Sequence, residues 1–180
     1  MWESRLVGFP KYMKNLKGFI TIVTLSLILS ASAMAQTVLT SIDGARVDVE
    51  AQSGKVVVLA VGAAWLPLSA KQVEFTNTLA KKYAGKNVVF YFVTTDSNNA
   101  RSKNYTSVAE IRSFATLNKL TATILCDPDG AATLKKYNVE QVPSFVILNK
   151  NGDLAGEPFG GIDPKYDITI PISKAIDRLL

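Results

Sequence analysis

Two hydrophobic periods alternate along this chain, one typical of buried strands and the other of amphipathic helices. Continuous apolar runs predict strands that are covered on both faces, and these runs lie at 55–64, 88–93, 122–126 and 144–148. Apolar positions at helical spacing predict helices at 70–83, 108–117, 131–137 and near 171–180. Strands separated by helices form βαβ units, so the sequence predicts an α/β fold with a largely parallel sheet.

Turn sequences divide this pattern and add antiparallel pieces. Residues 36–49 alternate around Asp43-Gly44, which predicts a short N-terminal hairpin. Asp127-Pro128-Asp129-Gly130 predicts a turn after the third buried strand. Asn151-Gly152 predicts a second hairpin whose outer strand runs from 154 to 159. The expected sheet is therefore mixed, with antiparallel strands added to a parallel centre.

Residues 1–35 are typical of a targeting segment rather than of a folded domain. Their basic start, apolar stretch at 19–29 and small residues at 33–35 are the three parts of a signal peptide. The sequence predicts a Sec-type signal peptide with cleavage before Gln36, a periplasmic or secreted location, and one domain over 36–180. An uncleaved N-terminal anchor is the alternative.

The charge balance gives no sign of a nucleic-acid partner. The full chain has 20 Lys and Arg against 15 Asp and Glu, and residues 36–180 have 16 against 14, a net charge of +2. The basic excess is therefore partly a property of the leader. The chain has no Lys/Arg stripe with interleaved aromatic residues, and Lys81-Lys82 and Lys135-Lys136 are typical of solvated helix faces. We expect no nucleic-acid partner, and no membrane association after cleavage.

A single cysteine, Cys126, and the absence of histidine restrict the chemistry. One cysteine cannot form an intramolecular disulfide, and without histidine there is no Ser-His or Cys-His nucleophile and no imidazole ligand. A metal site would need carboxylates alone, so we expect no metal and no other cofactor. Cys126 closes an apolar strand beside Asp127 and Asp129, so we expect a buried or half-buried thiol whose pKa the two acids raise.

Two segments give the chain a family resemblance. Trp65-Leu66-Pro67-Leu68-Ser69 stands between a predicted strand and a predicted helix, and Val142-Pro143 opens a later strand. In the thioredoxin superfamily a Trp-Cys-Pro-x-Cys motif occupies the first place, and a proline after Val or Thr the second. The chain resembles that superfamily over nearly all of 36–180. The inserted strand and helix before Val142-Pro143 are most similar to its exported thiol:disulfide interchange branch, the TlpA and ResA type.

The resemblance implies a thioredoxin-like fold, with a central mixed, mostly parallel sheet, helices on both faces and extra N-terminal strands. It also implies that Leu66 and Ser69 occupy the two positions of the redox cysteines. Leu66 cannot ionise and Ser69 has no sulfur, so dithiol exchange is not available at these positions. We therefore expect no catalytic residue there.

Ser69 also has a structural interpretation. Ser69-Ala70-Lys71-Gln72 has the form of a capping box, which predicts that Ser69 is the N-cap of the following helix. Pro67 at the first helical position is the alternative start. Trp65 and Leu66 are expected either to pack in the ordinary way, which we favour, or to form an apolar contact patch.

The resemblance further implies that the Val142-Pro143 peptide bond is cis and that the backbone of Val142 pairs with an extended substrate segment. A peptide-binding site is then expected at Trp65, Leu66, Pro67, Val142 and Pro143. The alternative is that Pro143 only begins an edge strand.

These observations favour one function and leave two alternatives. The leading hypothesis is an exported, redox-inactive module of the thiol:disulfide oxidoreductase family that binds a protein or peptide partner. The first alternative is a single-thiol redox protein that uses Cys126. The second is a structural subunit of an exported complex that docks through Trp65 and Leu66.

Overall fold

The fold is that of a computed structural model, which describes residues 36–163 and 165–180. The predicted signal peptide and its cleavage site lie outside the described residues. Among the described residues, no helix is long and apolar enough to cross a membrane.

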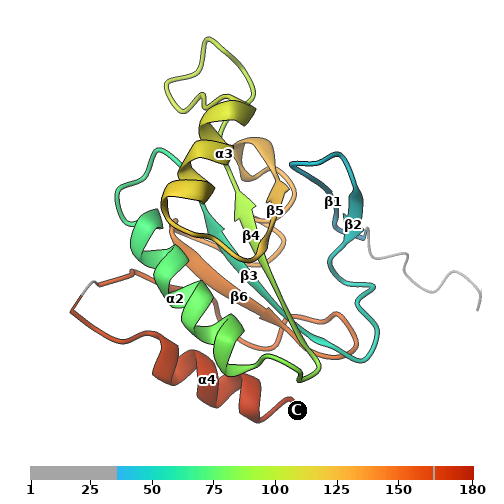
Figure 1. The fold of residues 1–180 in the computed structure, drawn as a ribbon. Coiled ribbons are helices and arrows are strands. Elements are labelled where there is room, and N and C mark those ends of the chain that lie inside the picture. The colour runs from blue at the N-terminus through green and yellow to red at the C-terminus, as the bar shows by residue number, and fades with distance from the viewer. Residues whose placement is uncertain (1–35, 164) are drawn as a thin grey trace, which may run out of the picture. The chain divides into compact units, whose positions relative to one another are not determined.

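Seven strands form one sheet in the order β2-β1-β5-β4-β3-β6-β7 (Figure 1). Their bounds are β1 Val38–Ser41, β2 Arg46–Asp48, β3 Val56–Gly62, β4 Val88–Thr94, β5 Thr123–Cys126, β6 Ser144–Leu148 and β7 Phe159–Gly160. The pairs β3–β4 and β4–β5 are parallel, whereas β1–β2, β1–β5, β3–β6 and β6–β7 are antiparallel. The sheet is mixed, as predicted, and its centre β5-β4-β3 is parallel. The N-terminal hairpin joins the sheet through β5. At the other side, β6 runs antiparallel to β3 and β7 runs antiparallel to β6.

Within the described residues, three α-helices accompany the sheet: α2 Ser69–Lys82, α3 Val108–Leu117 and α4 Thr169–Asp177. The helix α4 begins two residues before the predicted start at Pro171. Proline is tolerated there because the first backbone N–H groups of a helix need no intrahelical partner. The predicted outer strand at 154–159 is mostly absent. The strand β7 begins only at Phe159, and Leu154 makes an isolated bridge to Leu148.

The predicted helix at 131–137 is instead a series of turns after the short 3₁₀ helix η1 Pro128–Gly130. Backbone bonds of helical spacing form from Leu134 N to Gly130 O (3.1 Å) and from Tyr137 N to Thr133 O (3.0 Å). Asn138 then takes a positive φ of 56° and ends the series. So short a segment cannot sustain a regular helix by propensity alone. The turn predicted at 127–130 is confirmed.

The two faces of the sheet are covered differently. Buried residues of α2, α3 and α4 all join the hydrophobic cluster on one face, and Figure 1 shows these helices in front of the strands. On the other face, side chains of the strands pack against Val49 and the segment 132–142. The expectation of helices on both faces is therefore wrong, because the predicted second-face helix did not form. Each fully buried aliphatic side chain contributes about 1.5–3 kcal/mol to stability.

A polar cluster ties the N-terminal hairpin to the segment on this second face. The Glu50 carboxylate accepts a hydrogen bond from the Tyr137 hydroxyl (2.7 Å) and pairs with the Lys136 ammonium (2.7 Å). Thr37 donates to the same carboxylate from its backbone N–H (3.3 Å) and its hydroxyl (3.2 Å). Burial raises the pKa of Glu50, but the hydrogen bonds from Lys136 and Tyr137 outweigh burial and hold the pKa below its usual value.

We predict that Glu50→Gln lowers the free energy of unfolding by about 1–3 kcal/mol at neutral pH, because its partners lose a charged acceptor. Since the pKa is lowered in the folded state, the ionised carboxylate stabilises the protein above its unfolded pKa. This stabilisation is lost as the pH falls through the folded pKa, so the variant should lose less stability than the wild type on acidification to about pH 3. Urea unfolding at several pH values measures both effects.

Asp43→Asn is the matched control. Asp43 pairs with Arg112 (2.8 Å) on the surface, where such pairs contribute about 0–1 kcal/mol. Equal denaturation midpoints for Glu50→Gln and wild type would contradict the assigned role of Glu50.

Candidate functional site

The loop after β3 holds the first of the two signature segments. Trp65-Leu66-Pro67 follows the end of β3, and α2 begins at Ser69 with Leu68 in the N-cap position and no side-chain cap. The helix thus begins at Ser69, but Ser69 is not its N-cap, and the alternative start at Pro67 is wrong. Ser69 is fully buried, and its hydroxyl accepts from the Ala63 backbone N–H (3.3 Å) instead of capping the helix.

Gln72 does not complete the predicted capping box but makes hydrogen bonds to distant parts of the chain. Its buried side-chain amide donates to the carbonyl oxygens of Val61 in β3 (3.1 Å) and Ser144 in β6 (2.8 Å). One side chain from the first turn of α2 thus joins the helix to two strands. A hydrogen-bonded buried amide fixes relative positions because its alternative is an unpaired polar group away from water.

The second signature segment lies next to the first. Val61 is paired with Ser144 in the antiparallel register of β3 and β6, so the end of β3 lies beside the residue that follows Pro143. The Val142-Pro143 peptide bond is cis. The strand β6 lies between β3 and β7, so the alternative that Pro143 begins an edge strand is wrong.

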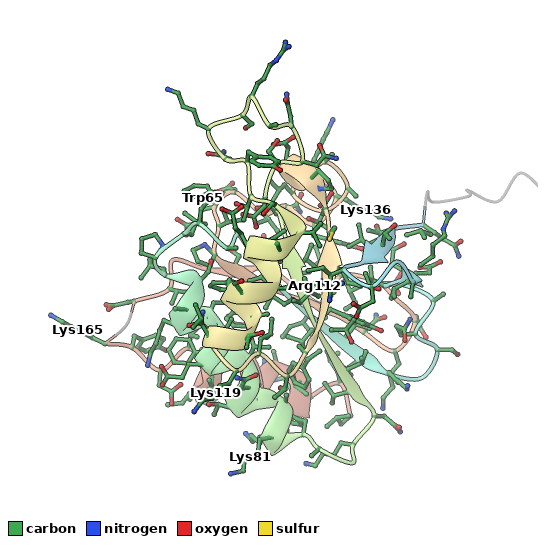
Figure 2. The ribbon with its side chains drawn as sticks, turned by 45° about the horizontal axis from the view of Figure 1, so that its top comes forward. Trp65, Lys81, Arg112, Lys119, Lys136 and Lys165 are labelled. Carbon is green, nitrogen blue, oxygen red and sulfur yellow. The ribbon has the colours of Figure 1, made fainter. Side chains whose placement is uncertain are left out.

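The five residues proposed from the sequence differ in their access to solvent. Trp65 is 48% exposed, Pro67 is exposed, Leu66 and Val142 are half-buried, and Pro143 is buried. Figure 2 shows Trp65 in the loop between β3 and α2. The favoured interpretation of Trp65 as ordinary core packing is wrong, and the apolar contact patch stays a prediction.

Asp96 is a component of this region that the sequence analysis missed. It is buried just beyond β4, and its Oδ2 accepts from the Ala64 backbone N–H (2.8 Å) and from the Thr94 hydroxyl. The other oxygen, Oδ1, has no hydrogen-bond partner among the described residues. Thr95 supports the same loop, because its N–H and hydroxyl both donate to the Gly62 carbonyl (2.7 and 3.0 Å). The polar run directly after the apolar run of β4 was the available signal.

Cys126 lies at the end of β5, in register with Thr94 of β4. It is half-buried, as predicted. Burial raises the pKa of its thiol and the Asp96 carboxylate raises it further, whereas Arg112 acts in the opposite direction. The predicted direction is confirmed, but the acid responsible is Asp96 rather than Asp127 or Asp129. The thiol is therefore held in its protonated, poorly nucleophilic form near neutral pH.

The described residues contain no group of three or more acids or thiols placed to hold a metal ion. Near the cis proline, the ionisable groups that they offer are the thiol of Cys126 and the buried carboxylate of Asp96. Such a set can position a backbone or a peptide, and it supplies no paired nucleophile and base.

The strand, loop and helix that face a cis-proline strand in a mixed sheet define a thioredoxin-like fold. A family model described as Redoxin matches residues 29–161, and the chain belongs to this family. None of the curated proteins matches the chain.

Solved structures agree with this classification. A thioredoxin-like protein from Aeropyrum pernix has a TM-score of 0.64 and 18% identity, and the match covers 89% of this chain and 99% of that one. A secreted Mycobacterium tuberculosis disulfide oxidoreductase homologous to E. coli DsbE has a TM-score of 0.58 and 23% identity, and the match covers 80% of this chain and 96% of that one. The exposed lipoprotein thioredoxin Etrx1 of Streptococcus pneumoniae has a TM-score of 0.61 and 21% identity, and the match covers 81% of this chain and 100% of that one. At these identities the likeness establishes the fold.

We predict that Ser69→Ala lowers the free energy of unfolding by about 1 kcal/mol, because the buried Ala63 N–H loses its acceptor. Ser69→Asp should be more destabilising than Ser69→Ala, since it places a carboxylate where the side chain is fully buried. Urea midpoints of the two variants test this order. If Ser69→Asp were as stable as the wild type, Ser69 would be acting as a solvated helix cap after all.

A second prediction concerns Cys126. Its alkylation by iodoacetamide should rise with pH around a midpoint above that of a free thiol, because burial and Asp96 both raise the pKa. Asp96→Asn should lower the midpoint and Arg112→Gln should raise it, since each removes one of the two opposing charges. Mass spectrometry of alkylation rates gives the midpoints. A wild-type midpoint at or below that of free cysteine would overturn the assignment.

Proposed function

We propose that this chain is an exported thioredoxin-fold protein in which Leu66 and Ser69 stand at the positions of a lost redox dithiol. We further propose that it binds extended segments of exported proteins at Trp65, Leu66, Pro67, Val142 and Pro143, which we call the docking site. The second part does not depend on sulfur chemistry.

The observation that carries this proposal is the hydrogen-bonded bridge made by Gln72. By joining α2 to Val61 and Ser144, it keeps the start of the helix beside the cis-proline strand. The backbone needed to pair with an extended segment is thus held next to the loop that carries Trp65. Peptide pairing of this kind relies on main-chain groups, which a change of side chains at positions 66 and 69 leaves in place.

The position of Cys126 argues against dithiol exchange and against the single-thiol alternative. It is the only cysteine of the chain, and β4 separates its strand from β3. Exchange requires a thiolate to attack and a second thiol to resolve the mixed disulfide. A thiol whose pKa is raised by burial and by Asp96 is poorly suited to the first step, and no second thiol exists for the next.

Export is supported by two independent observations. Residues 1–35 have the order of basic, apolar and small residues that signal peptides share. Two of the similar solved structures are described as a secreted oxidoreductase and an exposed lipoprotein. The proposed partners are therefore proteins of the same compartment.

The test restores sulfur to the site. We predict that residues 36–180 do not reduce insulin with dithiothreitol above a protein-free blank, and that Leu66→Cys with Ser69→Cys forms an intramolecular disulfide and gains this activity. The full burial of Ser69 suits a second cysteine that reacts only with its neighbour. Wild-type activity that persists in Cys126→Ser, or a folded double variant whose thiols both stay free under oxidising conditions, would contradict the proposal.

Docking is measured separately with a single thiol. In a Cys126→Ser background, the thiol of Leu66→Cys is reacted with an extended peptide that carries one activated disulfide, and separately with the small disulfide reagent alone. The ratio of the peptide rate to the reagent rate should be about 10-fold higher than for a thiol outside the docking site, because docking raises the local concentration of the peptide. Val108→Cys is the control, since Val108 is 53% exposed on α3 and away from the docking site in the sequence. Equal ratios for the two variants would exclude docking.

A further inference from the structure

A polar pocket borders the cis-proline loop. Its volume is about 670 Å³, and it is lined by Leu134, Lys135, Asn138, Val139, Glu140, Gln141, Ser144, Glu157, Pro158 and Gly160. Gln141 directly precedes Val142, Ser144 directly follows Pro143, and Gly160 is paired with Ser144 across β6 and β7. The loop that contributes to the docking site thus also forms a wall of this pocket, which we call the Glu140–Glu157 pocket.

The side chains around this pocket are polar and include two carboxylates. The carboxylates of Glu140 and Glu157 and the amides of Asn138 and Gln141 make no hydrogen bond or ion pair with another described residue. Among the described residues of the lining, Lys135 is the one cation against two carboxylates, a net charge of −1. Residues 36–180 as a whole have a net charge of +2, so the acidic character is local to the pocket.

Glycine at position 160 keeps the inner end of the pocket open. A Cβ at Gly160 would lie 2.8 Å from Gln141 Nε2 and 2.9 Å from Ser144 Oγ, closer than unbonded atoms of these kinds approach. Any larger residue would displace Gln141 or fill the space beside it. The pocket therefore depends on the absence of a side chain where β7 meets β6.

We infer that the Glu140–Glu157 pocket receives the side chain of a Lys or Arg from an extended segment held at the docking site. This inference rests on the proposed function and names the class of segment bound. Successive side chains of an extended segment point to opposite sides, so a residue next to the one that pairs with Val142 can reach the pocket. Ammonium and guanidinium groups carry only donors, which match the free acceptors, and an acidic side chain would meet two carboxylates.

The experiment compares peptides that differ at one position. Fluorescein-labelled peptides of one extended sequence carry Arg, Lys, Ala, Gln or Glu at the tested position, with the position moved along the peptide in parallel sets. Fluorescence polarisation with residues 36–180 should give dissociation constants that rise in the order Arg or Lys, then Gln and Ala, then Glu. We expect about a 5- to 10-fold preference for Arg over Gln, decreasing with salt because the pocket is open to solvent.

Variants of the lining connect the preference to the pocket. Glu140→Gln and Glu157→Gln should each reduce the Arg-to-Gln ratio and together abolish it, while the Gln peptide binds unchanged. Lys135→Gln should increase the ratio, because it removes the opposing charge. Gly160→Ala should weaken the Arg peptide more than the Ala peptide. Asp43→Asn is the control and should leave the ratio unchanged, since Asp43 follows β1 at the opposite end of the strand order from β7.

The outcomes separate this inference from the proposed function. If no peptide binds whatever its tested residue, the docking proposal itself is overturned, and the pocket inference with it. If peptides bind with equal affinity for every residue, or if the Arg preference survives Glu140→Gln with Glu157→Gln, docking stands and the assignment of the pocket is overturned. A ratio that falls in both single variants and rises in Lys135→Gln supports the inference.

Discussion

The position of every part of the candidate site depends on the burial of β3. All seven of its residues are withdrawn from water, and it pairs with β4 on one side and β6 on the other. Such a strand cannot shift its register by one residue without exchanging the residues that face the two hydrophobic clusters. Its end at Gly62 is therefore fixed in space, and so is the point at which the loop with Trp65 leaves the sheet.

Polar contacts hold the loop that follows this strand end in one conformation. Ser69, Asp96 and Thr95 satisfy the backbone groups of residues 62–64, which lie where the sheet no longer provides partners. The arrangement has a cost, because Gln72 Oε1 and Asp96 Oδ1 are buried without partners among the described residues. An unpaired buried acceptor destabilises a protein by about 1–3 kcal/mol. Gly62 contributes through its size, since a Cβ there would collide with Gln72 Oε1.

The sequence predicted the parts of the fold that are set by local periodicity. Continuous apolar runs predicted the strands β3 and β4, and apolar residues at helical spacing predicted the helices α2 and α3. The pair Val142-Pro143 indicated the second segment of the candidate site. The sequence did not predict which pairs are antiparallel, because the partner of a strand depends on long-range packing. The helix expected at 131–137 failed because its residues are organised by contacts with Asp127 and with the second face of the sheet. The prediction that Ser69 is the N-cap failed for a similar reason, since a capping motif does not show that the hydroxyl will be buried against Ala63.

In the proposed function, docking does not depend on redox chemistry at this site. The cis-proline strand is held by strand pairing and by the amide of Gln72, and neither contact involves the side chain of residue 66 or 69. Leu66 is half-buried, so it adds apolar surface where a thiolate would otherwise need stabilisation by the helix N-terminus. In the proposed function, Leu66 and Ser69 in place of two cysteines exclude nucleophilic attack and resolution and leave these contacts of the cis-proline strand intact. The proposed docking is therefore reversible, because no covalent step follows it.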